Sequence, residues 1–265
     1  MTRKGIWVDD PPSMVQTPAF WDHFPEHGLT TAGIMLESIG NGFNPMYTVA
    51  DLQKIRGLAF TRNVEIVLTI WPEPNKKYLD DLEAHVSDYI VASGCSALEF
   101  DTEGNWIPGK VSGFATLHLA SDYLAGIMDR LSKKHDIRIE LTTFTEHTEN
   151  SAKADLATHV HRLLPQAYSV ADRTNGAVPW GTRYAPGNMQ KLTLDRAKQV
   201  QGTHKLCCGL AAYDQQFAGH TAQEAMKLAW DTAVSYGVEE IRFWSSKWVF
   251  GIKKNGYSSQ FIKSV

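Results

Sequence analysis

The sequence predicts an α/β fold, a single (β/α)8 barrel over residues 1–265, on three observations. Eight short apolar runs rich in β-forming residues recur along the chain, most of the gaps between them can hold a helix, and no Pro/Gly/Ser-rich linker divides it. Alternating strands and helices are typical of a parallel sheet, and eight repeats favour closure into a barrel. An open, doubly wound sheet is the alternative, but Trp-Val-Asp-Asp-Pro-Pro follows the first strand where a dinucleotide-binding fold carries Gly-x-Gly-x-x-Gly.

Strands and helices are expected to alternate along the chain, with a helical pattern between several of the strands. The predicted strands are Gly5 to Asp9, Ala32 to Glu37, Val64 to Trp71, Ala97 to Asp101, Ile137 to Thr143, Leu164 to Tyr168, Lys205 to Ala212 and Ile241 to Trp244. The predicted helices are Val49 to Arg62, Lys77 to Ser93, Ala115 to His135, Ala152 to Leu163 and Thr221 to Tyr236. The last helix has the clearest start, because Thr221 can cap it and Glu224 stands three residues later, as in a capping box.

Composition excludes several classes of partner. A net charge of -3 and a pI near 6.4 give no electrostatic basis for binding nucleic acid or an anionic membrane. No apolar stretch reaches the roughly 20 residues of a membrane span, so we expect no membrane insertion. The three cysteines, Cys95, Cys207 and Cys208, lie in apolar runs and indicate buried thiols in a reducing compartment. The first residues enter a strand without a secretory signal, so we expect synthesis in the cytoplasm.

The fourth predicted strand carries three acids at alternate positions, Glu99, Asp101 and Glu103. Alternate side chains of a strand share one face, so these acids lie together, opposite Leu98 and Phe100. Clustered carboxylates raise one another's pKa and resist desolvation, so they are typical of a site where a partner or a chemical task compensates. Glu103 would lie nearest the substrate, with Asp101 one step deeper and able to hydrogen-bond it.

The carboxyl ends of barrel strands, with the loops that follow, form the active site in this fold. These ends carry carboxylates, amides and aromatic rings: Asp9, Asp10, Glu37, Trp71, Glu73, Asp101, Glu103, Thr145, Glu146, Gln166, Tyr168, Tyr213, Asp214 and Trp244. Bases are nearly absent from this set, which disfavours a phosphate or carboxylate substrate. Acids that move protons, beside rings that stack on sugars, indicate glycosidic cleavage.

The fourth strand resembles the D-x-x-D-x-D-x-E signature of family-18 glycoside hydrolases, the chitinase-like barrels. Ser96, Glu99, Asp101 and Glu103 occupy the four positions, so the last two match, the first Asp is absent and the second is Glu. Gln166-Ala-Tyr168 resembles the Q-x-Y of plant-type chitinases, and Trp244 stands where that family keeps a Trp floor. The resemblance implies that Glu103 is the general acid, that Asp101 orients the substrate N-acetyl group as internal nucleophile, and that Tyr168 assists that group.

Family-25 muramidases, common among phage lysins, are also similar, with D-x-E on the fourth strand and acids on the first, comparable to Asp9. Both families act on polymers of N-acetylated amino sugars. We therefore expect a monomeric hydrolase of such a polymer, bacterial peptidoglycan first, released to the cell wall by a helper such as a phage holin. The expected substrate-binding residues are Asp9, Glu37, Trp71, Gln166, Tyr213 and Trp244, and no cofactor or metal is expected.

Other interpretations of the same residues stay open. The acidic strand could be an exposed edge strand, Glu99 could be a structural acid paired with Arg138 or Arg242, and any of the aromatic residues could fill the core. A carbohydrate-binding barrel without catalysis would look much the same in sequence. A metal-dependent barrel hydrolase or isomerase is a third class, suggested by His159-Val-His161, but this pair falls at a predicted helix end, where residues two apart do not face each other.

Overall fold

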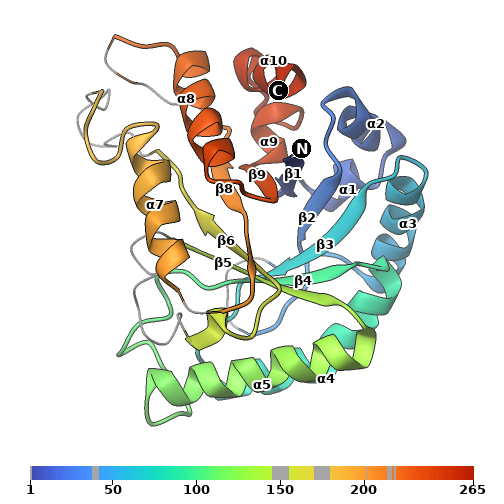
Figure 1. Cartoon of the computed structure of the whole chain (residues 1–265). Helices are drawn as coiled ribbons and strands as arrows, with labels where there is room; N and C mark the ends of the chain where they lie inside the picture. The colour runs from blue at the N-terminus through green and yellow to red at the C-terminus, as the bar shows by residue number, and fades with distance from the viewer. Residues whose placement is uncertain are drawn as a thin grey trace.

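The structure is a computed structural model that describes residues 2–37, 42–144, 155–169, 180–200, 202–213, 217 and 219–265. Its strands are β1 (Arg3–Val8), β2 (Thr31–Met35), β3 (Glu65–Ile70), β4 (Ala97–Asp101), β5 (Arg138–Phe144), β6 (Arg162–Gln166), β7 (Lys205–Leu206), β8 (Cys208–Ala211) and β9 (Glu240–Trp244). In the described part of the chain they are all parallel and form eight barrel positions, with β7 and β8 sharing the seventh. The barrel closes because β1 pairs with both β2 and β9, so the predicted (β/α)8 fold is confirmed and the open sheet is wrong (Figure 1).

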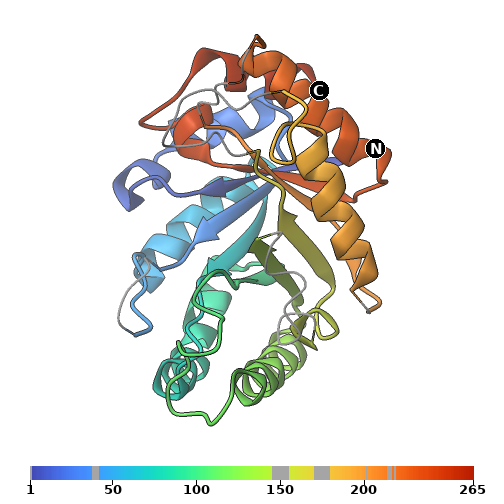
Figure 2. The same cartoon turned by 90° about the vertical axis from the view of Figure 1, so that its left-hand side faces the viewer.

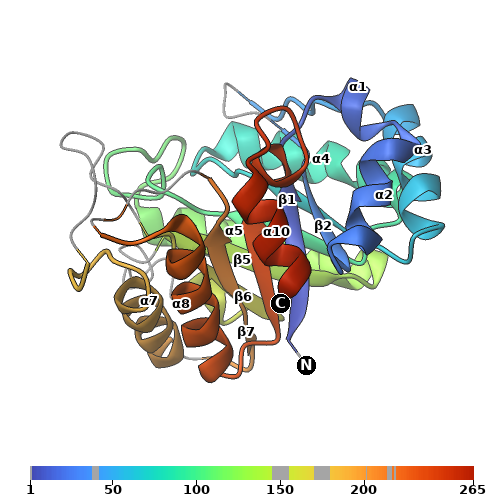
Figure 3. The same ribbon diagram turned by 90° about the horizontal axis from the view of Figure 1, so that it is seen from above.

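Helices surround this barrel. They are α1 (Pro12–Val15), α2 (Pro18–Glu26), α3 (Val49–Phe60), α4 (Lys76–Ser93), α5 (Leu117–His135), α7 (Asn188–Gln199), α8 (Ala222–Ser235), α9 (Ser246–Val249) and α10 (Gly256–Ser264). Neighbours in chain order contact one another, as α3, α4 and α5 do on one side of the barrel and α7 and α8 on the other (Figure 2). Viewed from above, α10 fills the place between α8 and α2, where Ser259 hydrogen-bonds His27 at 2.8 Å (Figure 3).

Several elements begin where local chemistry predicts. Thr221 accepts a hydrogen bond from the Glu224 backbone N–H, and the Glu224 carboxylate accepts one from Thr221, so the expected capping box of α8 is confirmed. The predicted helix Ala152 to Leu163 is wrong at its end, and its first three residues lie outside the described part. Arg162 and Leu163 belong to β6, because Arg162 pairs in register with Glu140 and buries its side chain in the barrel.

Side chains alternate between two cores, as strand geometry requires. Outward-facing residues such as Ile34, Leu68, Leu98 and Phe243 pack against the helices in one continuous apolar cluster. The cluster that faces inward is small and contains Trp7 and Tyr168. No helix among the described residues is long and apolar enough to span a membrane.

Two glycines make room for the Trp7 indole in the middle of the barrel. A Cβ on Gly33 would lie 2.8 Å from Trp7 Cδ1, and one on Gly209 would lie 3.0 Å from Trp7 Cη2. The ring therefore fills the barrel axis only because β2 and β8 present no side chain there. Its indole nitrogen donates to Glu99 at 2.7 Å, so Trp7 is both packing and a hydrogen-bond donor.

Below Trp7 the barrel holds a buried ion cluster. Arg242, which is fully buried, donates to Glu99, to Glu140 at 2.9 Å and to Glu240 at 2.8 Å. Arg162 adds a contact of 3.1 Å to Glu140. The cluster occupies the level at which most barrels place branched apolar side chains, and it supports the floor of the site above it.

Candidate active site

Glu99 and Asp101 lie on the inner face of β4, and Glu103 follows two residues after the strand ends. β4 lies between β3 and β5, so the interpretation as an exposed edge strand is wrong. Glu99 is fully buried, Asp101 is 5% exposed and Glu103 is half-buried, a gradient that follows their order toward the mouth. The three therefore sit in different environments.

Glu99 is the structural acid of the set. One of its oxygens accepts a hydrogen bond from Trp7 and the other from Arg242. Arg242 is therefore the base that pairs with Glu99. Arg138, the other base considered from the sequence, is level with Ala97, two residues before Glu99. Burial raises the pKa of Glu99 to about 7, and the neighbouring Glu140 and Glu240 add to the rise while Arg242 opposes it. A carboxylate held in this way orients its neighbours and does not reach the mouth.

Gln166, at the end of β6, joins the two outer acids. Its side-chain nitrogen donates to Asp101 Oδ1 at 3.1 Å and to Glu103 Oε1 at 3.1 Å. A neutral amide shared by two carboxylates fixes the positions of both and places no positive charge between them. The structure thus brings together three residues that the sequence predicted for the site.

Tyr168 completes this group. Its side chain is buried, and its hydroxyl has no hydrogen-bond partner among the described residues. Burial raises its pKa well above the usual value, with Asp101 and Glu103 among the charges that add to the rise, so the hydroxyl keeps its proton and is a donor. Tyr213 lies edge-on to it with ring centroids 6.3 Å apart.

Trp244 is the last residue of β9, at the position where a floor for the substrate was expected. It packs on Trp7 with ring centroids 6.0 Å apart and an interplanar angle of 59°. The peptide bond to Ser245 is cis. Because Trp244 is only partly buried, part of its surface remains open toward the mouth.

The acids that follow β1 and β2 are bonded to residues of other loops and helices, and not to Gln166. Asp9 forms an ion pair of 2.8 Å with Lys247, and Asp10 accepts a hydrogen bond from Ser246 at 2.6 Å. Glu37 accepts a hydrogen bond from Tyr78, and burial, the largest cause, raises its pKa to about 7. Asp10 therefore anchors the loop after β9, whereas Asp9 and Glu37 each keep one oxygen without a partner in the described structure.

Unused polar atoms gather around the mouth. At the carboxyl ends of the strands, buried atoms without a partner in the described part of the chain are Asp9 Oδ1, Glu37 Oε2, Trp71 Nε1, Thr143 Oγ1, Tyr168 Oη and Ser245 Oγ. Such atoms are unfavourable in a folded protein unless water or a ligand satisfies them. Water or a polar ligand at this end of the barrel would satisfy them.

Lys247, Tyr78, Thr143 and Ser245 were not predicted from the sequence. Ser245 and Lys247 follow β9 directly and could have been found by extending the strand-end rule by a few residues. Tyr78 carries no sequence signal, since it lies in the first turn of α4 and reaches Glu37 through the fold. Thr145, Glu146 and Asp214 lie outside the described residues.

The metal interpretation gains no support at the mouth. His159 contacts Asp129 at 3.4 Å and His161 accepts the backbone N–H of Ile139 at 3.0 Å, both at the opposite end of the barrel. Among the described residues, the group with metal-ligand spacing is His23, Glu26 and His27 on α2. These residues lie outside the barrel, so they offer nothing to chemistry at Glu103.

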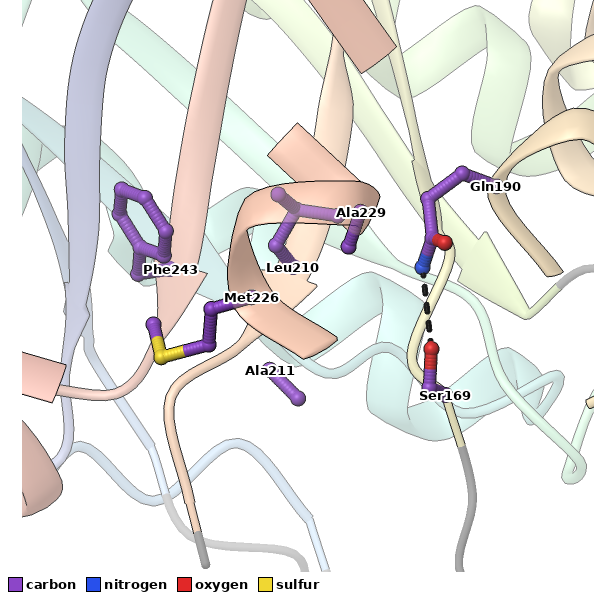
Figure 4. Close-up of a pocket in the computed structure, with 7 residues that line it drawn as sticks. All are labelled: Ser169, Gln190, Leu210, Ala211, Met226, Ala229 and Phe243. Carbon is purple, nitrogen blue, oxygen red and sulfur yellow. Dashed lines mark hydrogen bonds between the residues drawn. The ribbon is translucent and has the colours of Figure 1, made fainter. Parts of the chain in front are cut away.

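A small cavity behind β8 is not part of the site. It measures about 10 Å³ and lies under α8 between Leu210, Met226 and Phe243, with Gln190 donating to Ser169 at 3.3 Å on its far side (Figure 4). A space of this size holds at most one water molecule. Gln190 there donates also to the backbone oxygen of Ala167, which ties α7 to the end of β6.

No protein-family model matches the chain, and no curated protein matches it in sequence. Solved structures match it in fold. The catalytic domain of a hyperthermophilic chitinase from Pyrococcus furiosus superposes with a TM-score of 0.62 at 12% identity, covering 92% of this chain and 83% of that chain. A class V chitinase from Pseudomonas fluorescens Pf-5 gives 0.66 at 11% identity, covering 99% of each chain.

The similar structures are not all enzymes. A xylanase-alpha-amylase inhibitor protein solved with trehalose gives a TM-score of 0.63 at 14% identity, covering 98% of each chain. At identities this low the similarity shows a barrel fold of the kind that glycoside hydrolases use. The chemistry of this chain has to be argued from its own residues.

Proposed function

We propose that this protein is a glycoside hydrolase that cleaves a β-linked polymer of N-acetylated amino sugars, with Glu103 as general acid. The observation that carries the proposal is the Gln166 amide between Asp101 and Glu103, with the buried hydroxyl of Tyr168, which no described residue hydrogen-bonds. An acid, a second carboxylate and a free hydroxyl donor are the groups that acetamido-assisted hydrolysis requires.

In the first step, protonated Glu103 gives its proton to the glycosidic oxygen as the bond to the anomeric carbon breaks. The acetamido oxygen of the same sugar attacks that carbon and forms a cyclic oxazolinium ion. Asp101 accepts a hydrogen bond from the acetamido N–H, whose positive charge grows, and Tyr168 donates to the acetamido oxygen and orients it. Trp244 supports the sugar ring from below.

In the second step, the Glu103 carboxylate takes a proton from water, and the water oxygen attacks the anomeric carbon from the side that the leaving group vacated. The ring opens back to the acetamido group, Glu103 regains its proton and the anomeric configuration is retained. On the seventh barrel strand, the described positions that face inward are Cys207, Gly209 and Ala211. None of these three residues has a carboxylate that could act as a nucleophile.

Bacterial peptidoglycan is the substrate that we propose to test first, with chitin as the close alternative. Both polymers carry the acetamido group that the mechanism uses. The similar solved structures include chitinases, one of them complexed with chito-oligosaccharides, and mannanases. Of these polysaccharides, the ones with an acetamido group suit the Asp101 and Tyr168 pair.

The test is the clearing of purified peptidoglycan beside the hydrolysis of a chitin oligomer, with mass analysis of the products. New reducing ends on muramic acid would assign a muramidase, and new ends on glucosamine a glucosaminidase or chitinase. Glu103→Gln should abolish turnover, whereas Glu73→Gln, which changes another half-buried acid near the strand ends, should keep most of it. Full activity of Glu103→Gln would contradict the proposal, and full activity of Asp101→Asn would contradict only the acetamido-assisted step.

A carbohydrate-binding barrel without catalysis is the second candidate. Two observations favour it: one similar fold belongs to an inhibitor protein solved with trehalose, and Ser96 and Glu99 depart from the family-18 signature. Binding and turnover measured on the same glycan separate the two candidates. Saturable binding without product would support the binding protein, and loss of turnover with a chelator would favour a metal-dependent enzyme.

A further inference from the structure

Glu37 is held differently from the other buried acids of the described chain. Those acids are bonded to arginine, to hydroxyl and backbone donors or to an amide: Glu99, Glu140 and Glu240 to Arg242, Asp10 to Ser246 and Ile252, and Asp101 to Gln166. Glu37 is 3% exposed, and one of its oxygens accepts from the Tyr78 hydroxyl. The other, Oε2, has no hydrogen-bond partner among the described residues.

No positive charge compensates the Glu37 carboxylate within the described part of the chain. Burial raises the pKa of Glu37 to about 7, and the groups that oppose the rise, the Tyr78 hydroxyl and the backbone of Asn44 and of Trp71, are all neutral. An ionised carboxylate that is buried without a cation is unfavourable. A cation bound beside Oε2 would therefore stabilise the ionised form.

Trp71 is the neighbour of Glu37 on the next strand. Met35 of β2 pairs with Thr69 of β3, and the Leu36 N–H donates to the Thr69 carbonyl at 2.8 Å. Glu37 and Trp71 each lie two residues further on, so they stand at the same level on the inward side. The Trp71 Nε1 and the Oγ1 of fully buried Thr69 are buried and have no partner in the described structure. The Trp71 ring is partly exposed, so a sugar can pack on it while Nε1–H donates to a hydroxyl.

The strand order places these two residues beside the acid pair of the candidate active site. One strand, β3, separates β2 from β4, so the end of β2 lies two strand spacings, about 10 Å, from the end of β4. An oligosaccharide that has one unit at Asp101 can therefore have another at Glu37. The two positions differ in charge, because Asp101 shares an amide with Glu103 whereas Glu37 lacks a cation.

We propose that Glu37 and Trp71 form a subsite for a sugar unit that carries a free, positively charged amino group. The ammonium donates to Glu37 Oε2, and the Trp71 Nε1–H donates to a hydroxyl oxygen of the same unit. This subsite rests on the proposed function for the class of polymer. It adds that the preferred polymer is partly deacetylated, with an acetylated unit at Asp101 and a free amine at Glu37.

The first experiment measures affinity by calorimetry in the full chain with Glu103→Gln, so that turnover does not interfere. The two probes are the tetrasaccharide of β-linked glucosamine and the tetrasaccharide of N-acetylglucosamine. Glu37→Gln, added to this chain, keeps the size of the side chain and an oxygen for Tyr78 but removes the charge. It should weaken the glucosamine tetramer about tenfold and the acetylated tetramer less than about twofold. Retained binding of the acetylated tetramer also shows that the variant is folded.

Two further variants in the same chain separate a specific contact from general attraction. Glu73→Gln is the matched control, because it removes a charge that acts on Glu37 and leaves the Glu37 carboxylate in place. It should weaken the glucosamine tetramer less than about threefold, since a more distant charge is screened. Trp71→Phe keeps a ring and removes Nε1–H, so it should weaken both tetramers about fivefold, the loss of one hydrogen bond.

The proposal is overturned if the glucosamine tetramer does not bind, or if Glu37→Gln weakens both tetramers equally. It is also overturned if Glu73→Gln weakens the glucosamine tetramer as much as Glu37→Gln does, or if Trp71→Phe changes neither affinity. All four readouts are affinities in a chain without turnover. A parent chain that hydrolyses no glycan is therefore a separate result, which contradicts the proposed function and not the subsite.

Discussion

The barrel interior holds carboxylates at two levels, and it treats them in opposite ways. At the deep level Glu99, Glu140 and Glu240 surround Arg242, and all of them are fully buried. At the mouth, Asp101 and Glu103 share the neutral amide of Gln166. The deep acids are held by a buried guanidinium group, whereas the acids at the mouth are held by a neutral amide. The same strand thus supplies scaffold below and chemistry above.

The largest effect on activity is expected at Glu103. Glu103→Gln keeps the size of the side chain and its contact to Gln166 but removes the proton donor, so turnover should fall about 10²- to 10⁴-fold. The free energy of unfolding should change by less than about 0.5 kcal/mol, since the group is half-buried and the amide keeps an oxygen for the Gln166 contact. Glycan hydrolysis and denaturant unfolding, measured on the same preparation, check both statements. A large loss of stability would show that Glu103 has a structural role, like the acids of the deep level.

Arg242 tests the deep level. Arg242→Met leaves the carboxylates of Glu99, Glu140 and Glu240 buried without their common partner, so the free energy of unfolding should fall by about 3–5 kcal/mol. The double variant Arg242→Met with Glu99→Gln removes one of the stranded charges and should recover part of the loss. A single variant as stable as the parent chain would show that the cluster contributes nothing to the fold.

The pH dependence of stability separates the two levels further. Burial raises the pKa of Glu99 and of Glu37 from 4.5 to about 7, so the folded chain holds more protons than the unfolded chain between these values. The contribution of these groups is therefore fully present below pH 4.5 and is lost as the pH rises through 7. Between about pH 5 and about pH 8 we expect each of the two groups to lower the stability by about 2–3 kcal/mol.

Two variants show how much of this fall in stability with pH comes from the deep level and how much from the mouth. Glu99→Gln removes the contribution of the deep level and Glu37→Gln that of the mouth, each measured by denaturant unfolding across the pH range. If Glu37→Gln alone abolished the slope, Glu99 would be ionised throughout beside Arg242. A slope of the opposite sign in the parent chain would rule out the raised pKa of both groups.

The fold was predictable because its signals are local. Each strand is a short apolar run, and the helix at Thr221 starts with its own cap. The alternation on β4 places Glu99 and Asp101 on one face, with Glu103 just after the strand, without any knowledge of the partner strands. Placing that strand fourth in a barrel was then enough to bring Gln166 and Tyr168 to the same mouth.

The partners of the acids were less predictable, because register decides them. Arg138 and Arg242 both lie on strands, but Arg138 is level with Ala97, one step below Glu99. Asp9 meets Lys247 across 238 residues of sequence, and no local pattern connects them. The end of the helix before β6 was wrong because Arg162, a charged residue, lies inside the barrel, where the ion cluster accommodates it.

The smallest effect on activity is expected at Tyr168, where removing the hydroxyl should lower turnover without lowering stability. Tyr168→Phe removes a buried hydroxyl that has no partner in the described structure, so the free energy of unfolding should stay unchanged or rise by up to about 1 kcal/mol. Turnover should fall about tenfold, because the hydroxyl would donate to the acetamido oxygen only in the reacting complex. Tyr78→Phe is the matched control: it removes a hydroxyl that Glu37 uses, so stability should fall by about 1 kcal/mol. If Tyr168→Phe lowered stability as Tyr78→Phe does, the Tyr168 hydroxyl would be structural. The proposed step would then have no donor to the acetamido oxygen.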